Sequence, residues 1–243
     1  MKKIGIISQA RMTSTRLPGK VLKETNGLPL LKYHVDRLKE SGYPLYIATT
    51  INQTDDPIVA FCEQENIAFY RGSEAHVLSR YYECAKEHGL DIIVRVTSDC
   101  PLIDGVQVRK GVERYLAEED ENLYLSNGMS STFPRGFDFE VFSFHLLEEA
   151  FENASLPAEI EHVTPYLYLN KDSKVKKIGY LYHQNKSNYR VTVDTSEDFE
   201  LIRRLIVEHQ AHLLSVDGIV DVLDSQEELV AINAHIEQKK LGK

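Results

Sequence analysis

Short apolar runs alternate with amphipathic helical segments through the first half of the chain. The apolar runs are rich in β-branched residues and predict strands at 3–8, 44–50, 67–72 and 91–99. Helical periodicity predicts helices between them at 28–42, 55–66 and 74–89. Strands that are apolar on both faces and separated by helices form a mostly parallel sheet that is covered on both sides. The pattern therefore predicts a doubly wound, Rossmann-like α/β fold.

The pattern changes near residue 122, where strand-like stretches become more frequent than helical ones. The strand-like stretches are 123–128, 137–143, 175–183 and 189–194, and the helical ones are 144–154 and 159–170. Such a section within an α/β chain predicts an inserted β-rich arm at about 127–188, a common place for a dimer contact or a substrate lid. Helical periodicity returns at 196–210. We interpret residues 1–243 as a single domain that carries this arm.

Charge and cysteine content exclude several classes of protein. The chain has 28 Lys and Arg against 37 Asp and Glu, so its net charge is −9. That balance argues against a general nucleic-acid binder and against docking on anionic membranes. No apolar run reaches the roughly eighteen residues that a membrane span requires. The three cysteines, Cys62, Cys84 and Cys100, have no metal-ligand spacing, which predicts reduced thiols in a cytoplasmic protein.

A basic loop follows the first predicted strand, in the sequence QARMTSTRLPGK at 9–20. It carries Arg11, Arg16 and Lys20 with no acidic residue, the three hydroxyls at 13–15, and Gly19. Positive charge, hydroxyl groups and free backbone N–H groups at the end of a parallel strand suit a polyphosphate. The loop matches neither the Walker A pattern nor GxGxxG. The alternative is a solvated basic turn.

Two aspartates are predicted to end strands near this loop. Asp99 ends the fourth predicted strand, and Asp194 ends the stretch YRVTVD. The carboxyl ends of strands are where open α/β sheets bind ligands, and Mg²⁺ usually takes one or two carboxylates plus substrate phosphates. Asp99 has an alternative role as the cap of a helix that begins near Asp104. Asp194 is less needed as a cap, because Thr195 or Ser196 can cap the helix that follows.

Five ordered motifs resemble the cytidylyltransferase family that makes CMP-activated acidic sugars, such as 3-deoxy-manno-octulosonate and acylneuraminate. The motifs are ARMTSTRLPGKVL, VRVTSDCPLID, RGFDFEVFS, EHVTPY and YRVTVDTSEDFELI, and the match runs from residue 4 to about residue 205. The chain is most similar to the spore-coat polysaccharide biosynthesis branch. The resemblance implies a nucleotide-diphospho-sugar transferase fold, CTP as donor, Mg²⁺ as cofactor, and a homodimer formed through the arm.

Carried over residue by residue, the resemblance also assigns roles. It implies that Arg11, Arg16 and Lys20 hold the CTP phosphates and act in catalysis, that Ser14 contacts the nucleotide, and that Asp99 and Asp194 ligate Mg²⁺. At two positions where the branch usually has glycine, this chain carries Thr13 and Ser98 instead. Each is expected to add a side chain beside the nucleotide.

The implied reaction is the transfer of CMP to an acidic sugar. A sugar oxygen attacks the α-phosphorus of CTP in line and pyrophosphate leaves, so catalysis is mostly positioning and electrostatic stabilisation. Arg135, Glu140 and His162 are candidates for contacts with the sugar, although His162 is more simply explained as a structural histidine. Two other functions remain open, a glycosyltransferase of the same fold and a catalytically idle assembly protein.

Three arginines have a structural interpretation. Arg95 and Arg190 lie inside apolar stretches, and a buried arginine usually has an acidic partner, so we expect ion pairs. Arg80 and Glu74, in RGSEAHVLSRYY, are expected on a solvated helix face, with an approach to ribose or sugar as the alternative.

Overall fold

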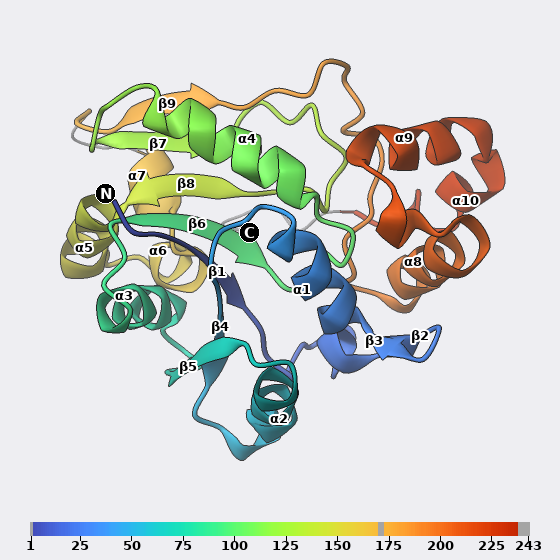
Figure 1. Cartoon of the computed structure of the whole chain (residues 1–243), viewed down its shortest axis with the longest axis horizontal. Coiled ribbons are helices and arrows are strands. Elements are labelled where there is room, and N and C mark those ends of the chain that lie inside the picture. The colour runs from blue at the N-terminus through green and yellow to red at the C-terminus, as the bar shows by residue number, and fades with distance from the viewer. Residues whose placement is uncertain (1, 170–172, 238–243) are drawn as a thin grey trace.

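The computed structural model describes residues 2–169 and 173–237, and its centre is a seven-stranded sheet in the order β5-β4-β1-β6-β8-β7-β9. The strands are β1 (Ile4–Gln9), β4 (Leu45–Thr50), β5 (Ala68–Gly72), β6 (Ile92–Thr97), β7 (Leu123–Ser126), β8 (Glu140–Ser143) and β9 (Lys176–Gly179). β5, β4, β1 and β6 are parallel, β8 runs antiparallel to β6 and β7, and β9 is parallel to β7. The mostly parallel α/β sheet predicted from the sequence is confirmed (Figure 1).

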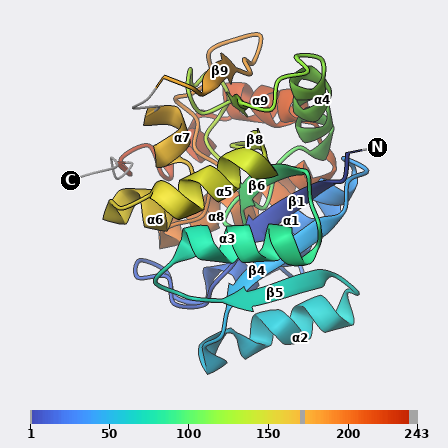
Figure 2. The same cartoon turned by 90° about the vertical axis from the view of Figure 1, so that its left-hand side faces the viewer.

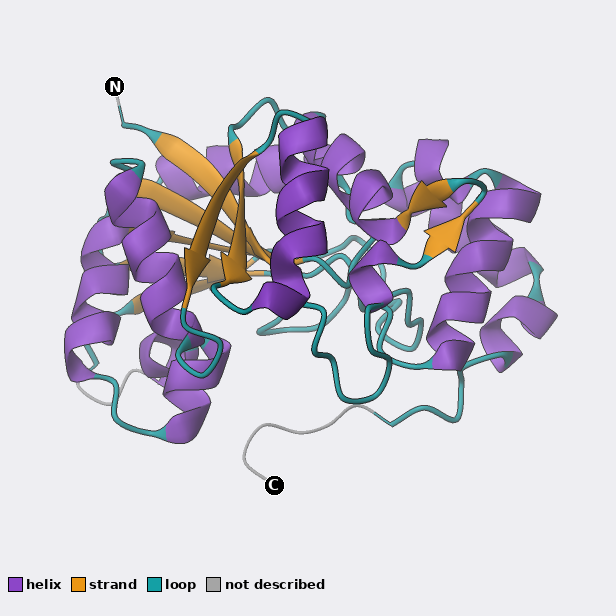
Figure 3. Cartoon of the chain, turned by 90° about the horizontal axis from the view of Figure 1, so that it is seen from below, coloured by secondary structure: helices purple, strands orange, loops and turns teal. Residues whose placement is uncertain are grey.

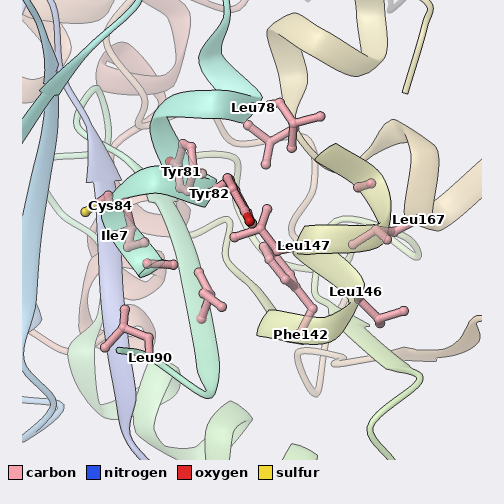
Figure 4. Close-up of a cluster of buried hydrophobic side chains, with 14 of the residues drawn as sticks. Ile7, Leu78, Tyr81, Tyr82, Cys84, Leu90, Phe142, Leu146, Leu147 and Leu167 are labelled. Atoms are coloured by element: carbon pink, nitrogen blue, oxygen red, sulfur yellow. The ribbon is translucent and has the colours of Figure 1, made fainter. Parts of the chain in front are cut away.

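Helices cover both faces of the sheet, as the apolar strands require. One face is covered by α3 (Val77–Glu87), α5 (Phe144–Asn153), α6 (Pro157–His162) and α7 (Pro165–Leu169) (Figure 2). The other face is covered by α1 (Leu30–Lys39), α2 (Asp56–Gln64) and α4 (Gly105–Leu116). On the first face, Ile7 of β1, Tyr81 of α3 and Phe142 of β8 belong to one cluster of buried side chains (Figure 4).

The C-terminal helices form a second packing unit beyond the carboxyl ends of the parallel strands. They are α8 (Ser196–His209), α9 (Val216–Ser225) and α10 (Glu227–Ala231), and the short pair β2 (Glu24–Thr25) and β3 (Leu28–Pro29) lies beside them (Figure 3). Their apolar cluster reaches back to the start of α1 through Leu30 and Tyr33. Ser215 caps α9, whose Val216, Ile219 and Leu223 are buried at helical spacing. We did not predict this helix.

The segment at about 127–188, which we expected to be an inserted arm, does not stand apart from the central sheet. It contributes β8 and β9 to the central sheet, and α5–α7 lie between these strands in the chain. The single helix expected at 159–170 is interrupted at Val163, which has a φ of 72°, and Asn170 lies outside the described residues. The role of this segment in a dimer stays a prediction.

The stretch 189–194 was wrongly predicted to be a strand. Within it only Arg190 makes a β-bridge, to Arg135. Its valines, Val191 and Val193, are fully buried against the C-terminal helices rather than in a sheet. Packing on helices therefore explains the alternation of apolar residues that suggested a strand.

The three cysteines are free and buried. Among the described residues, no helix is long and apolar enough to cross a membrane.

Candidate functional site

The basic loop folds back on itself and delivers Lys20 to the carboxyl edge of the sheet. The Gly19 N–H donates to the Met12 carbonyl (2.8 Å), which closes the loop. Gly19 has a φ of 67°, a conformation that favours glycine, and it starts a short 3-10 turn at Lys20–Leu22. Lys20 Nζ then donates to Asp99 Oδ2 (2.9 Å) and to Asp194 Oδ1 (2.8 Å). One ammonium group therefore bridges two carboxylates that lie 95 positions apart in the sequence (194 − 99).

Asp99 is available to this site because a different residue caps the next helix. The Asp104 side chain accepts from the Gln107 N–H (3.0 Å) at the start of α4, and its second oxygen accepts from the Val216 N–H (2.9 Å). The alternative that Asp99 is the cap is therefore wrong. Asp99 lies two positions beyond the end of β6, at the edge where ligands bind in open α/β sheets.

Asp194 lies in the loop before α8 and is held by arginines. Its Oδ2 accepts from Arg190 (2.8 Å) and pairs with Arg16 (2.9 Å). The cap of α8 is Thr195, as one of our two alternatives predicted, and Asp198 completes a capping box. Asp198 is fully buried and binds Arg190 as well, at 2.8 Å and 2.9 Å, which confirms the expected ion pair of that arginine.

The segment that leads to Asp194 is fastened to the loop before β8. The Arg135 N–H donates to the Tyr189 carbonyl (2.9 Å), and the Val191 N–H donates to the Arg135 carbonyl (2.7 Å). Gly136 has a φ of 110°, and a Cβ there would lie 2.7 Å from the backbone of Val191. A glycine at this position therefore lets the two segments approach closely.

Burial and ion pairing act against each other at the bridged carboxylates. Burial alone would raise the pKa of Asp99, but the charge of Lys20 and several hydrogen bonds hold it well below its usual range. Burial alone would lower the pKa of Lys20, yet the charges of Asp99 and Asp194 raise it overall. The ammonium and Asp99 are thus both charged throughout the neutral pH range.

The two carboxylates have the donor chemistry that a divalent cation takes. Oxygens of Asp99 and Asp194 already converge on one cation, the Lys20 ammonium, at 2.9 Å and 2.8 Å. Within the described part of the chain, no group of three His, Cys, Asp or Glu side chains is placed to hold a metal. Two carboxylates completed by substrate phosphates are a usual arrangement for Mg²⁺.

The remaining residues of the basic loop lie apart from this network. Arg11 is 3.6 Å from Glu74, and Thr13 donates a hydrogen bond to the same carboxylate. Ser14 is half-buried in the loop. The structure therefore brings Arg16 and Lys20 to the carboxylates and places Arg11 with Glu74.

Ser98, which we expected to add a side chain beside the nucleotide, is buried and hydrogen-bonded within the protein. It is 1% exposed, and its hydroxyl lies 2.7 Å from that of Ser8, which in turn lies 2.8 Å from His34 Nε2. His34 Nδ1 lies 2.9 Å from the Cys100 carbonyl, which can only accept a hydrogen bond. The ring therefore carries its proton on Nδ1 and accepts from Ser8 at Nε2. This chain of hydrogen bonds fastens the turn that carries Asp99, and we did not predict it, although His34 falls among the apolar positions of its helix.

The three candidates for sugar contacts differ in their surroundings. Glu140 accepts hydrogen bonds from Arg95 (2.7 Å), Tyr124 (2.8 Å) and Thr164 (2.9 Å), so its carboxylate is engaged within the protein and the expected ion pair of Arg95 is confirmed. His162 ends α6, and burial lowers its pKa, with a further lowering by the charge of Arg95. The Arg135 side chain is exposed.

Arg80 was wrongly expected on a solvated helix face. It is 1% exposed at the start of α3, whereas Glu74 is partly exposed.

A sheet edge with a basic loop, two carboxylates and a bridging cation lies where α/β proteins with open sheets bind their ligands. The sequence model of the family described as "Cytidylyltransferase" matches residues 4–232. The chain therefore belongs to the cytidylyltransferase family.

Relatives and solved structures agree with this assignment. An uncharacterised protein of Methanocaldococcus jannaschii is 38% identical over 98% of this chain and 97% of its own length. The spore coat polysaccharide biosynthesis protein SpsF of Bacillus subtilis is 32% identical over 84% of this chain and 87% of its own. A 3-deoxy-manno-octulosonate cytidylyltransferase of Pectobacterium carotovorum is 32% identical over 47% of this chain and 46% of its own.

Among solved structures, a cytidylyltransferase from Leptospira borgpetersenii has a TM-score of 0.91 at 32% identity, covering 99% of this chain and 100% of its own. A CMP:2-keto-3-deoxy-manno-octonic acid synthetase in complex with CTP has a TM-score of 0.62 at 18% identity, covering 86% of this chain and 100% of its own. The second similarity concerns the fold alone. The resemblance to this family that the motifs suggested is confirmed.

Proposed function

We propose that the protein transfers CMP from CTP to an acidic sugar with release of pyrophosphate, in the cytoplasm, as a step in surface or spore-coat polysaccharide biosynthesis. The observation that carries the proposal is the Lys20 ammonium held between Asp99 and Asp194, with Arg16 beside it. Cations and carboxylates that alternate in this way at the edge of the sheet can bind a triphosphate together with a divalent cation. The named activity of the related 3-deoxy-manno-octulosonate cytidylyltransferase supports an acidic sugar as the acceptor.

The roles of the residues follow from their positions. Arg16 and Lys20 would bind the phosphates, and Arg11 and Ser14 would contact the nucleotide from the same loop. In the reaction a sugar hydroxyl oxygen bonds to the α-phosphorus, and the bond from that phosphorus to the oxygen bridging to the β-phosphate breaks. The hydroxyl proton passes to solvent. Charge develops on the phosphate oxygens, where the cationic side chains stabilise it.

We propose Mg²⁺ as the cofactor, held by Asp99 and Asp194. When bound it would neutralise charge on the phosphates and on the departing pyrophosphate. Lys20 would then exchange its two carboxylate partners for phosphate oxygens. Arg190 would keep Asp194 oriented, since it binds the Oδ2 atom while Lys20 binds Oδ1.

On the acceptor side we propose Arg135, Glu140 and His162. Arg135 can bind a sugar carboxylate with two parallel hydrogen bonds, a geometry that guanidinium groups favour. Glu140 would act through the network that it forms with Arg95 and Thr164.

We also propose a homodimer formed through the segment 127–188. This segment exposes large apolar side chains at Met129 and Leu181, which are 37% and 58% exposed.

The test is pyrophosphate release from CTP and Mg²⁺ in the presence of 3-deoxy-manno-octulosonate or N-acetylneuraminate. We expect release with CTP and one such acid, and a fall in turnover of about 10²–10³ for Lys20→Met, because a well-placed charge donor is lost. Lys23→Met is the matched control, since that ammonium lies over the Phe199 ring, 5.4 Å from its centroid, and outside the network.

Turnover of Lys20→Met within twofold of the wild type would remove Lys20 from the mechanism. Binding and consumption of a nucleotide-diphosphate sugar instead of CTP would identify the glycosyltransferase alternative. Failure to bind any nucleotide would leave the idle assembly protein as the better interpretation.

A further inference from the structure

Asn233 is a buried side chain of the C-terminal unit that reaches the ion-pair network of the site. It lies two positions after the end of α10 and is 4% exposed. Its Nδ2 donates to the Arg190 carbonyl (3.0 Å) and to Asp198 Oδ1 (2.8 Å). A carbonyl and an ionised carboxylate can only accept hydrogen bonds, so the nitrogen of the amide must face them. Asn233 therefore ties the segment after α10 to the two residues that hold Asp194.

Asp198 connects this amide to Asp194. Its Oδ1 accepts from Asn233 and from Arg190 Nε (2.8 Å). Its Oδ2 accepts from Arg190 Nη2 (2.9 Å) and from the backbone N–H groups of Asp194 (2.9 Å) and Thr195 (3.1 Å). The same Nη2 of Arg190 donates to Asp194 Oδ2 (2.8 Å). The backbone and the carboxylate of Asp194 are thus both held by groups that Asn233 contacts.

The backbone of Arg190 is fastened on two sides. On one side it forms a bridge with Arg135, and on the other its carbonyl accepts from Asn233. The described residues leave a cavity of about 60 Å³ that Arg190 and Asn233 both line. Close packing normally fixes buried side chains, and it is incomplete beside this cavity. The hydrogen bonds of Asn233 therefore do more to position Arg190 than they would in a filled core.

The amide is not needed to fold the C-terminal unit. Thr195 and Asp198 complete the capping box of α8 between themselves. The helices of the unit pack through apolar side chains, among them the fully buried Ile219 and Leu229. Burial of an amide is costly unless it is hydrogen-bonded, so an apolar side chain would serve packing as well or better. The amide at position 233 is explained by the charged groups that it orients.

We propose that Asn233 is a positioning residue that acts through Arg190 and Asp198 to hold the Asp194 carboxylate in the orientation that binds Mg²⁺. This inference rests on the proposed function, in which Asp194 is a metal ligand, and adds the C-terminal unit to the site. Residues that orient a metal ligand without touching the metal typically contribute about 10–100-fold to metal affinity. Asn233 lies one hydrogen bond further from the metal, so we expect an effect of about 10-fold.

The experiment is equilibrium binding of CTP, without sugar, over a range of free Mg²⁺ concentrations to the wild type, Asn233→Leu and Asn233→Ser. Both variants remove the two hydrogen bonds. We expect the Mg²⁺ concentration that gives half of the full CTP affinity to rise about 10-fold in each. At saturating Mg²⁺ the CTP affinity should return to within about twofold of the wild type, because Arg16 and Lys20 are unchanged.

Ile219→Ala is the matched control. Ile219 is fully buried on α9 in the apolar cluster of the same unit, and its side chain has no polar atom. This variant should lower the melting temperature, because it leaves a cavity in the core. It should keep the Mg²⁺ requirement of the wild type, so it separates loss of stability in the C-terminal unit from loss of orientation at Asp194.

Two results would overturn the inference. One is a Mg²⁺ requirement within about threefold of the wild type in a variant of Asn233 that melts at a lower temperature, which is the signature of a purely structural amide. The other is a loss of CTP affinity that is equal at every Mg²⁺ concentration. If one of the two variants does not fold, the other decides by the same criteria. Failure of the wild type to bind CTP with Mg²⁺ would refute the proposed function instead, so the two failures are distinguishable.

Discussion

His34 makes the stability of the folded chain depend on pH over a defined range. The ring is fully buried, with Nδ1 donating to the Cys100 carbonyl and Nε2 accepting from Ser8. Burial lowers its pKa from 6.5 to about 4, although the Cys100 carbonyl and the charge of Asp99 oppose the effect. A second ring proton would place a donor against the Ser8 hydroxyl and would add a charge to the core.

The direction of the effect follows from which state binds the proton. Above pH 6.5 neither the folded nor the unfolded chain protonates this ring, so the folded state keeps its full stability. Between pH 6.5 and about 4 only the unfolded chain takes up the proton, and stability falls as the pH falls. Each pH unit corresponds to about 1.4 kcal/mol, so the total loss from this group is about 3 kcal/mol.

Urea unfolding of the wild type and of His34→Gln between pH 8 and pH 4 measures this contribution. At pH 8 the variant should be the less stable protein, because it loses buried contacts. The difference between the two proteins should then shrink by about 3 kcal/mol as the pH falls to 4. His145→Gln, which replaces an exposed histidine on α5, is the matched control and should follow the wild type. A difference between wild type and His34→Gln that stays constant over this range would refute the reasoning.

Three further predictions concern the site and the proposed dimer. Gly136→Ala should lower the free energy of unfolding, measured in urea, by more than about 1 kcal/mol, because a Cβ would meet the Val191 backbone and Gly136 has a φ of 110°. The same variant should bind CTP more weakly, because the segment that carries Asp194 would move. Unchanged CTP binding would contradict this second prediction. With Mg²⁺ present, CTP at about a hundred times its dissociation constant should raise the melting temperature by about 5–10 °C. Chelation of the metal should abolish this rise. A rise that survives chelation would contradict the proposal that Mg²⁺ takes part in CTP binding. Leu181→Asp should convert a dimer into a monomer in sedimentation experiments, and a monomeric wild type would disprove the dimer.

The parallel part of the sheet was predictable because its strands are buried on both faces. Such strands appear in the sequence as continuous apolar runs, for example Ile4–Ile7 and Ile92–Val94. These runs can be recognised without knowing which strands lie next to them. The insertion of β8 between β6 and β7 was not predictable in this way. It depends on antiparallel pairing between segments about fifty residues apart, such as Arg95 with Glu140, and no local pattern specifies that partner.

In the candidate site, too, features that depend on local sequence were predictable, and features that depend on distant residues were not. Asp99 and Asp194 were identifiable because each ends a stretch of apolar sequence that predicted a strand, and Lys20 because it belongs to a basic loop without acidic residues. The orientation of Ser98 was not, since it depends on a hydroxyl of β1, Ser8, 90 positions away. The burial of Arg80 was also hidden, because it follows from the close approach of α3 to Gly72 rather than from the polarity of the helix.

The ion-pair network around Lys20 is an internal salt with no net charge. Its three carboxylates balance its three cations, and the six residues are Asp99, Asp194, Asp198, Arg16, Lys20 and Arg190. Because the network is neutral, it exerts little long-range electrostatic attraction on a triphosphate. The protein as a whole has a net charge of −9 and repels the triphosphate. Nucleotide binding then depends on an exchange of partners at contact distance. Moderate salt should consequently speed the encounter with CTP by screening the repulsion, in contrast to proteins that steer anions with a basic cleft.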